Sequence, residues 1–164
     1  MSDIDTKVTQ LFAQFGVSYR LLPHTEPVFT VETAAAQRGV VKEEMVKSIL
    51  MREKTGQKRY VMACVLGHMR VDHRAVRAHL PGDWKRLTFT SGDEITNVTG
   101  YVQGAVAPLC LPDDVPVIFD QAIAECANVN ISSGDPMAGI ELKPQDLIRL
   151  AKATLAPIAA LPTS

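Results

Sequence analysis

The segment from Gly100 to Pro108 holds the spacing in this chain that is best suited to chemistry. Gly100 and Gly104 stand four residues apart, and Pro108 follows four residues later, between apolar segments. Glycine permits positive φ and close backbone approach, so such a loop can turn successive N–H groups toward one point. A nest of this kind would bind an anion or stabilise an oxyanion without a charged side chain. The alternative is structural: Gly100 ends a helix and Gly104 makes a turn.

Lys47 is the second candidate, in the run Val46-Lys47-Ser48-Ile49. The pattern predicts that Lys47 ends a short helical segment and that an apolar strand begins after it. The lysine stem would then lie along apolar surface with its ammonium group free. An ammonium fixed in this way could bind a phosphate as a point charge. The alternative is an ordinary solvated surface lysine.

The histidines and cysteines are weaker candidates. None of the four histidines has metal-ligand spacing with another His or a Cys, so we expect no metal and no cofactor. His24 is kept as a candidate because it lies in a loop after a predicted strand. Cys110 could be a nucleophile with a histidine as its base, but its apolar run favours a buried, inert thiol. An odd number of cysteines, three, favours free thiols in a reducing cytoplasm.

The composition restricts the class of protein. A chain of 164 residues with 46% hydrophobic and 21% charged residues predicts one globular domain, residues 1–164. A net charge of −1 argues against a protein that coats nucleic acid, although a small patch could still grip a few phosphates. The N-terminal residues lack a secretory signal, and no apolar run is long enough to span a membrane. We therefore expect a cytoplasmic protein.

The periodicity predicts an α+β fold with a mixed, curled sheet and helices packed around it. The expected helices cover residues 2–15, 30–38, 42–47, 72–80, 91–98 and 120–126, with a last helix from Pro144. The expected strands cover residues 17–22, 48–52, 59–66, 84–89, 106–111, 115–119, 128–132 and 139–142. A polar loop over residues 132–139 is either a hairpin turn or the wall of a pocket.

Taken in order, several segments resemble the YbaK/prolyl-tRNA-synthetase-associated editing family. They include Leu22-Pro23-His24, Val46-Lys47-Ser48-Ile49, Thr99-Gly100-Tyr101, Gly104 to Pro108 and Asn130-Ile131-Ser132-Ser133-Gly134, and they run from about Tyr19 to Leu150. The resemblance implies a compact α+β domain whose sheet is partly closed into a barrel. It also implies a freestanding deacylase that hydrolyses the ester of wrongly charged tRNA, often tRNA for proline carrying alanine or cysteine. The implied partners are the acceptor end of the aminoacyl-tRNA and prolyl-tRNA synthetase.

The same resemblance implies roles for individual residues. Lys47 would hold the phosphate of the terminal adenosine, and the loop from Gly104 to Pro108 would present backbone amides to the ester carbonyl. A ribose hydroxyl could orient the attacking water, so neither a metal nor a protein base is required. We assign catalysis to Lys47, Gly104 and Pro108, and substrate contacts to His24, Thr30, Gly100, Ala105, Val106, Ala107, Ser133 and Gly134.

The loop departs from the family pattern, because Gln103 precedes Gly104 and Ala105-Val106-Ala107 fill a segment where many relatives carry Arg and a second Gly. These small apolar residues could narrow or dry the pocket, which leaves the amino acid open. Two other functions remain. One is a domain that binds aminoacyl-tRNA or another adenosine ligand without hydrolysis. The other is a hydrolase that uses the Cys110 thiol.

Overall fold

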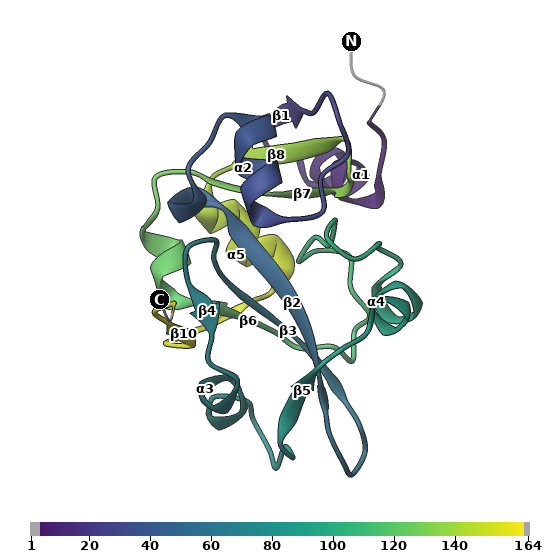
Figure 1. Ribbon diagram of the computed structural model, residues 1–164, viewed down its shortest axis with the longest axis vertical. Coiled ribbons are helices and arrows are strands. Elements are labelled where there is room, and N and C mark those ends of the chain that lie inside the picture. The colour runs from purple at the N-terminus through teal and green to yellow at the C-terminus, as the bar shows by residue number, and fades with distance from the viewer. Residues whose placement is uncertain (1–3, 163–164) are drawn as a thin grey trace.

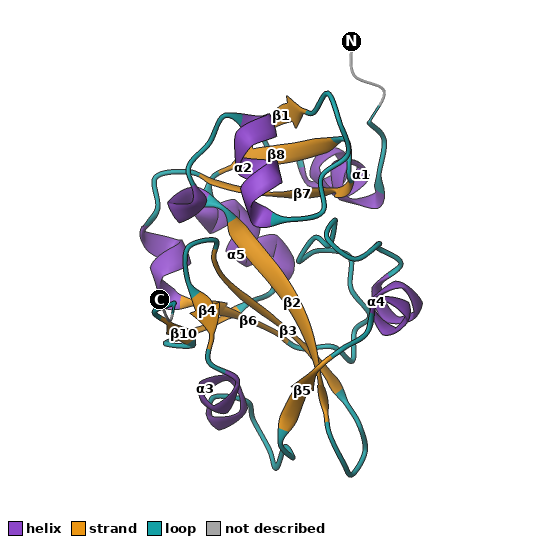
Figure 2. Ribbon diagram, viewed as in Figure 1, coloured by secondary structure: helices purple, strands orange, loops and turns teal. Residues whose placement is uncertain are grey.

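The computed structural model describes residues 4–162, which form a mixed α+β arrangement of three sheets (Figures 1 and 2). The largest sheet has five strands in the order β5-β2-β3-β6-β9, with β3-β6 and β6-β9 parallel and the other pairs antiparallel. Its strands are β2 (Val46–Glu53), β3 (Tyr60–Leu66), β5 (Leu87–Phe89), β6 (Val117–Asp120) and β9 (Thr154–Ala156). This sheet has two edge strands, β5 and β9, so it is curled and open rather than closed into a barrel.

A three-stranded antiparallel sheet lies at the other end of the molecule, in the order β1-β8-β7 (Figure 1). Its strands are β1 (Arg20–Pro23), β7 (Val129–Asp135) and β8 (Ala138–Leu142). A bulge interrupts β7 between Ser132 and Asp135, and a parallel bridge between Met45 and Asn130 ties this sheet to the start of β2. A small third sheet pairs β4 (Arg70–Val71) with β10 (Ala159–Ala160).

The helices begin and end where capping residues allow. They are α1 (Lys7–Phe15), α2 (Val31–Arg38), α3 (His73–Ala78), α4 (Gly92–Thr99) and α5 (Pro144–Ala151), with short 3-10 turns η1 (Lys42–Glu44) and η2 (Gln121–Glu125). The hydroxyl of Ser91 accepts a hydrogen bond from the Glu94 amide at the start of α4, and the Glu94 carboxylate accepts one from the Ser91 amide. This reciprocal capping box satisfies two amides that would otherwise lack partners.

Both faces of the β2-β3 hairpin are buried, and this divides the core in two. On β3, Met62 and Cys64 join the larger cluster, which also holds Phe12 of α1 and Leu147 of α5. The intervening residues join a second cluster with Val76 of α3. Successive side chains of a strand point to opposite faces, so a strand covered on both sides reads as the continuous apolar run seen in β3.

A buried carboxylate lies beside the turn of this hairpin. Glu53 is fully buried and accepts hydrogen bonds from the Arg59 guanidinium at 2.8 and 3.0 Å and from the amides of Arg59 and Lys85. The hydrogen bonds from Arg59 are the main reason that the pKa of Glu53 falls to about 2. The paired carboxylate therefore fixes the hairpin turn to the segment that precedes β5.

The α+β class and most predicted elements are confirmed, with shorter bounds. Three expectations were wrong. Residues 106–111 form a loop, in which the Leu109 carbonyl accepts a hydrogen bond from the Tyr101 hydroxyl and no strand ladder is formed. Lys47 lies within β2 and pairs with Val65, because the helical turn ends at Glu44. The first helix starts at Lys7 because Thr6 caps it; Ser2 and Asp3 lie outside the described residues.

Candidate active site

A pocket of about 160 Å³ lies where α2, the start of β2, the loop after α4 and strand β7 meet. It contains four of the residues predicted from the sequence: Thr30, Lys47, Gly104 and Val106. The remaining lining residues are Phe29, Val31, Ala34, Arg38, Met45, Val46, Ser48 and Ser132. Two segments about 57 residues apart in sequence, around Lys47 and Gly104, therefore line the same hollow.

Lys47 reaches this pocket from the second position of β2. Its ammonium group donates a hydrogen bond to the Met69 carbonyl at 2.5 Å, and the side chain is half-buried. Burial lowers the pKa of Lys47, an effect that the nearby Glu32 carboxylate opposes. Among residues 4–162 no carboxylate lies within ion-pair distance of Lys47 Nζ. The cation is thus positioned by a neutral partner, which leaves its charge available to an anion.

The loop after α4 is closed on itself by Tyr101. The Tyr101 hydroxyl donates a hydrogen bond to the Leu109 carbonyl at 2.6 Å, which spans residues 102–108. The Tyr101 ring is buried, and a Cβ on Gly134 would lie 2.9 Å from it. Gly100 has φ +80 and ends α4, as the structural alternative predicted, and it does not line the pocket. Gly100 and Gly134 therefore shape the loop from outside the pocket.

Gly104 is the residue of this loop that no other amino acid could replace. Its φ is +87, and a Cβ there would lie 2.6 Å from the Phe29 carbonyl oxygen and 2.7 Å from Phe29 Cα. No L-residue adopts this conformation at such a contact without moving the backbone. The loop can therefore press against residue 29, directly before α2, and complete the pocket wall.

Some backbone N–H groups of this loop are free to bind a ligand. The Ala105 amide donates to the Val102 carbonyl at 3.0 Å, so it closes a turn. Within the described chain, the amides of Gly104, Val106 and Ala107 have no hydrogen-bond partner. Ala105, Ala107 and Pro108 are buried behind the pocket and do not line it. This is the arrangement expected of a cradle built from N–H groups, with apolar residues supporting it from behind.

Sequence reasoning missed Arg38, the last residue of α2, which lines the pocket. Its guanidinium donates to His24 Nε2 at 3.1 Å and to Asn130 Oδ1 at 2.9 Å, and burial lowers its pKa to about 10. None of the ion pairs among residues 4–162 involves Arg38. A basic residue before a C-cap glycine is ordinary for a helix, so no local pattern distinguishes it.

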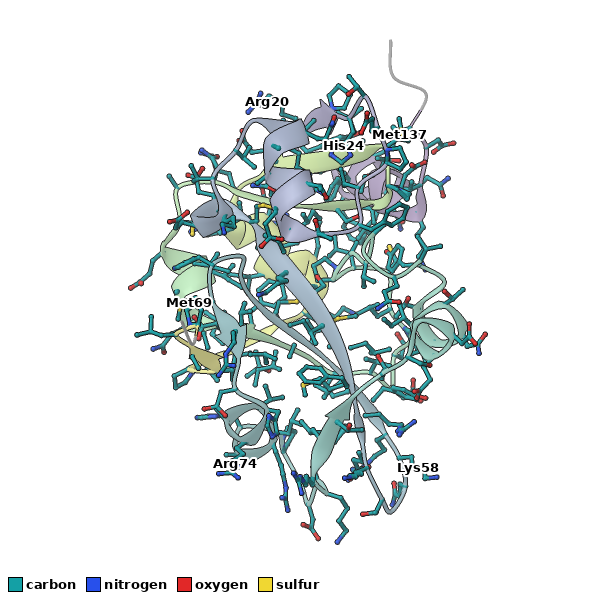
Figure 3. The ribbon with its side chains drawn as sticks, viewed as in Figure 1. Arg20, His24, Lys58, Met69, Arg74 and Met137 are labelled. Carbon is teal, nitrogen blue, oxygen red and sulfur yellow. The ribbon has the colours of Figure 1, made fainter. Side chains whose placement is uncertain are left out.

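His24 supports Arg38 instead of lining the pocket itself. Its Nδ1 lies 2.7 Å from the Pro136 carbonyl, an acceptor, so this nitrogen carries the proton and Nε2 accepts from Arg38. Burial lowers the pKa of His24, and the Pro136 hydrogen bond opposes this only in part. Figure 3 shows His24 close to Met137 at this end of the molecule. A neutral histidine thus orients a half-buried cation.

The predicted polar residues of β7 divide between two roles. Ser133 is fully buried, and its hydroxyl donates to the Ala138 carbonyl at 2.7 Å across the hairpin. Ser132, the residue before it, lines the pocket and accepts a hydrogen bond from the Gly134 amide. Alternation along the strand explains the difference, because neighbouring side chains face opposite sides. The residue of this segment that lines the pocket is therefore Ser132, and neither Ser133 nor Gly134 lines it.

Cys110 is unsuited to nucleophilic catalysis in this structure. Its sulfur donates to the Lys7 carbonyl at 3.4 Å, and burial raises the pKa of the thiol. The hollow that it lines contains no histidine. A reactive cysteine needs a lowered pKa and an adjacent base, so the geometry opposes the thiol alternative. All three cysteines are free thiols, as predicted.

Among residues 4–162, no group of three or more His, Cys, Asp or Glu side chains is arranged to hold a metal ion. No helix in this range has the length and apolar character needed to cross a membrane.

The sequence model of a protein family, the aminoacyl-tRNA editing domain, matches residues 25–150, which include Lys47 and the whole loop from Gly100 to Pro108. The chain belongs to this family. The predicted family is therefore confirmed, and with it the class of enzyme, a hydrolase of aminoacyl-tRNA esters. The matched range holds all four predicted residues that line the pocket.

Individual relatives agree with this assignment. The chain is 24% identical to the prolyl-tRNA editing protein ProX of Acetoanaerobium sticklandii over 92% of this chain and 93% of that protein. It is 24% identical to the multifunctional Ser/Thr-tRNA deacylase ProXp-y of Escherichia coli K12, over 91% and 89%. A proline–tRNA ligase of Bacillus licheniformis is 30% identical over 64% of this chain, but the matched part spans 18% of that enzyme.

Solved structures show the same fold. A crystal structure of a hypothetical protein superposes with a TM-score of 0.84 at 24% identity, covering 94% of this chain and all of that one. A candidate trans-editing enzyme for prolyl tRNA synthetase superposes with a TM-score of 0.75 at 21% identity, covering 96% and 99%. The mixed sheet, curled and without barrel closure, is therefore that of the family.

Proposed function

We propose that this protein hydrolyses the ester of wrongly charged tRNA in trans, with the pocket between α2 and the loop after α4 as its active site. One observation carries the proposal: Lys47 and the Gly104 loop, far apart in sequence, line one hollow inside the family-matched region. The names of two relatives that match most of the chain, an editing protein and a deacylase, support action on a free aminoacyl-tRNA.

The chemistry needs little from the protein. Water attacks the acyl carbon, the bond from that carbon to the ribose oxygen breaks, and the ribose oxygen takes up a proton as the amino acid leaves. Lys47 would hold the phosphate of the terminal adenosine, and the amides of Gly104 and Val106, which line the pocket, would stabilise the oxyanion. Each such donor contributes roughly 10²–10³ in rate. The vicinal ribose hydroxyl would orient the water.

The substrate that we propose is tRNA for proline carrying a small wrong amino acid, such as alanine or cysteine. A pocket of about 160 Å³ lined by Ala34, Met45 and Val106 favours a small side chain. The resemblance to proline-specific editing proteins supports the tRNA and suggests prolyl-tRNA synthetase as a partner. Arg38 adds a cation to the pocket, where it would bind a second anionic group of the substrate.

A deacylation panel tests this proposal. The panel contains tRNA for proline charged with alanine, cysteine or serine, together with correctly charged prolyl-tRNA. We expect rapid release of one small wrong amino acid, little release of proline, and a 10- to 100-fold lower rate in Lys47→Met, since charge-assisted hydrogen bonds contribute about 1.5–3 kcal/mol. Methionine keeps an apolar stem against β2. The matched control is Lys42→Met, an exposed lysine nearby that lies outside the pocket.

The same panel tests the binding-module alternative. That alternative predicts that wild type binds the charged tRNA but releases no amino acid from any member. Equal rates in Lys47→Met and wild type would instead contradict the role of Lys47 while leaving the hydrolysis in place.

A further inference from the structure

The positive charge of this chain is concentrated at the end opposite the pocket. Residues 52–86 hold nine of the seventeen Lys and Arg residues but only three of the eighteen Asp and Glu residues. This segment includes the β2-β3 turn, α3 and the start of β5, which lie together at that end, while β3 and β4 run back toward the middle of the molecule (Figure 1). Figure 3 shows Lys58 and Arg74 at one end of the long axis and His24 and Met137 at the other. Nine cations against three carboxylates leave an excess of six positive charges in this segment, which the net charge of −1 conceals.

Most of these cations are exposed and unpaired. Arg52 pairs with Glu94, Arg59 with Glu53, and Lys85 with Asp83. The others are exposed and form no ion pair within residues 4–162: Lys54, Lys58, Arg70, Arg74, Arg77 and Arg86. Arg70 lies on β4 near the middle of the molecule, and the other five lie on the β2-β3 turn, α3 and the segment before β5. Unpaired cations at one end of an acidic protein repel one another, so an anionic partner would stabilise them.

Three of these cations line a hollow of about 630 Å³ between α3 and the segment before β5, which we call the basic groove. Its lining includes Arg74, Arg77 and Arg86 beside the buried Trp84, with Asp83 as its one carboxylate. A neighbouring hollow of about 190 Å³ shares Arg86 and adds Lys54 and the exposed ring of Phe89. Guanidinium groups bind phosphate in a bidentate fork, so three of them along a groove fit a run of phosphates.

The basic groove and the pocket are joined by one face of the large sheet. Lys47 and Met51 are four residues apart on β2 and so face the same side of the sheet, and Met51 packs in the same cluster as Val76 of α3. The Lys47 ammonium binds the carbonyl of Met69, directly before Arg70 in β4, and α3 follows. With strand rise of about 3.3 Å per residue, the length of β2 separates the two sites by roughly 20–25 Å.

We propose that the basic groove binds the phosphate backbone of the tRNA acceptor stem while the 3′ end enters the pocket. The inference rests on the proposed function, because it takes its ligand from the pocket. Phosphate contacts position a duplex without reading its sequence, and a single-stranded 3′ end leads from that duplex to the esterified ribose. One exposed aromatic ring is too few for a stacking track, so the groove suits duplex RNA better than a single strand.

The test removes two groove arginines whose side chains form no hydrogen bond within the described chain, in the double variant Arg74→Gln/Arg86→Gln. Its matched control is Lys143→Gln/Lys152→Asn, which removes two exposed cations outside the groove; asparagine suits the positive φ of residue 152. Binding of deacylated tRNA for proline is measured against salt concentration. We expect about 10-fold weaker binding and a slope of log K against log salt that is smaller by about 2.

A second measurement locates the effect. Deacylation is compared on full aminoacyl-tRNA and on an aminoacylated CCA trinucleotide, which lacks the duplex. We expect KM for the tRNA to rise about 10-fold with kcat unchanged, and the trinucleotide to be hydrolysed at the wild-type rate. A short RNA duplex should compete with tRNA, whereas a single-stranded RNA of equal charge should compete poorly.

Three results would overturn the proposal: unchanged tRNA affinity and salt slope in the groove variant, an equal loss in the control variant, or an equal loss on the trinucleotide. Preferential competition by single-stranded RNA would assign the groove to another ligand. If wild type hydrolyses no ester, the proposed function fails, but the salt-dependent binding of deacylated tRNA still decides whether the groove binds RNA.

Discussion

The two ends of this protein use the same cationic residue types in different surroundings. At the pocket, Lys47 and Arg38 are half-buried and are held by neutral partners, a carbonyl for the lysine and His24 and Asn130 for the arginine. At the basic groove, Arg74 and Arg86 are exposed. Burial strengthens electrostatic interactions and protects them from salt, whereas exposed charges are screened. The pocket is therefore built for exact placement of a few atoms, and the groove for salt-sensitive attraction.

The largest expected effect is a loss of deacylation when the pocket is disrupted at Gly104. Gly104→Val should lower deacylation at least 100-fold on both tRNA and the trinucleotide, because the new side chain meets the Phe29 backbone and displaces the amide cradle. Gly16→Val is the matched control, since Gly16 also has positive φ but has nothing within 4 Å of an added Cβ. Single-turnover rates on the two substrates give the comparison. Wild-type activity in Gly104→Val would mean that the loop is only a turn.

A somewhat smaller effect is expected for the residue that sequence reasoning missed. Arg38→Met should lower kcat/KM about 10- to 100-fold on both substrates, the loss expected from one charge-assisted hydrogen bond. Arg20→Met, which removes an exposed arginine paired with Glu141, should retain wild-type kcat/KM. A loss confined to full-length tRNA would move Arg38 from the pocket chemistry to stem binding.

The third prediction concerns the scaffold of the groove. Glu53→Gln should lower the free energy of unfolding by about 1.5–3 kcal/mol, since the buried group loses its charge-assisted bonds with Arg59. The pKa of Glu53 is lowered, so its stabilisation is full above pH 4.5 and is lost as the pH falls toward 2. Urea unfolding of wild type and variant across this range should converge at the acid end. A constant difference at all pH values would exclude the ionised carboxylate as the cause.

The smallest expected effect is a dependence of folding stability on pH that arises from His24, beside the pocket. The pKa of His24 is lowered by burial, so the unfolded chain binds its proton first, and stability should begin to fall below pH 6.5. Protonation of Nε2 would also remove the acceptor of Arg38. His24→Asn should flatten this part of the stability curve, and replacement of His79, an exposed histidine outside the pocket, is the control. Parallel curves for wild type and His24→Asn would contradict the assignment.

Local signals in the sequence predicted much of the fold. The capping box at Ser91, the glycine after Arg38 and the apolar run of β3 each indicate an element through backbone chemistry that acts within a few residues. The loop over residues 106–111 was the main failure. Its apolar residues read as a strand, but they are buried as the support of a loop that Tyr101 closes. Hydrophobic pattern reports burial, and it does not by itself distinguish a strand from a buried loop.

Residue type and short spacing are enough to identify the family motifs, the glycine at position 104 and the lysine at position 47. Which of these residues share a pocket depends on long-range packing, since Lys47 and Gly104 meet through β2, α2 and the loop. The tertiary structure likewise selected Ser132 over Ser133, through the alternation of β7, and Arg38 through contacts with His24 and Asn130. The basic groove arises in the same way, because folding brings α3 and the segment before β5 together around one hollow.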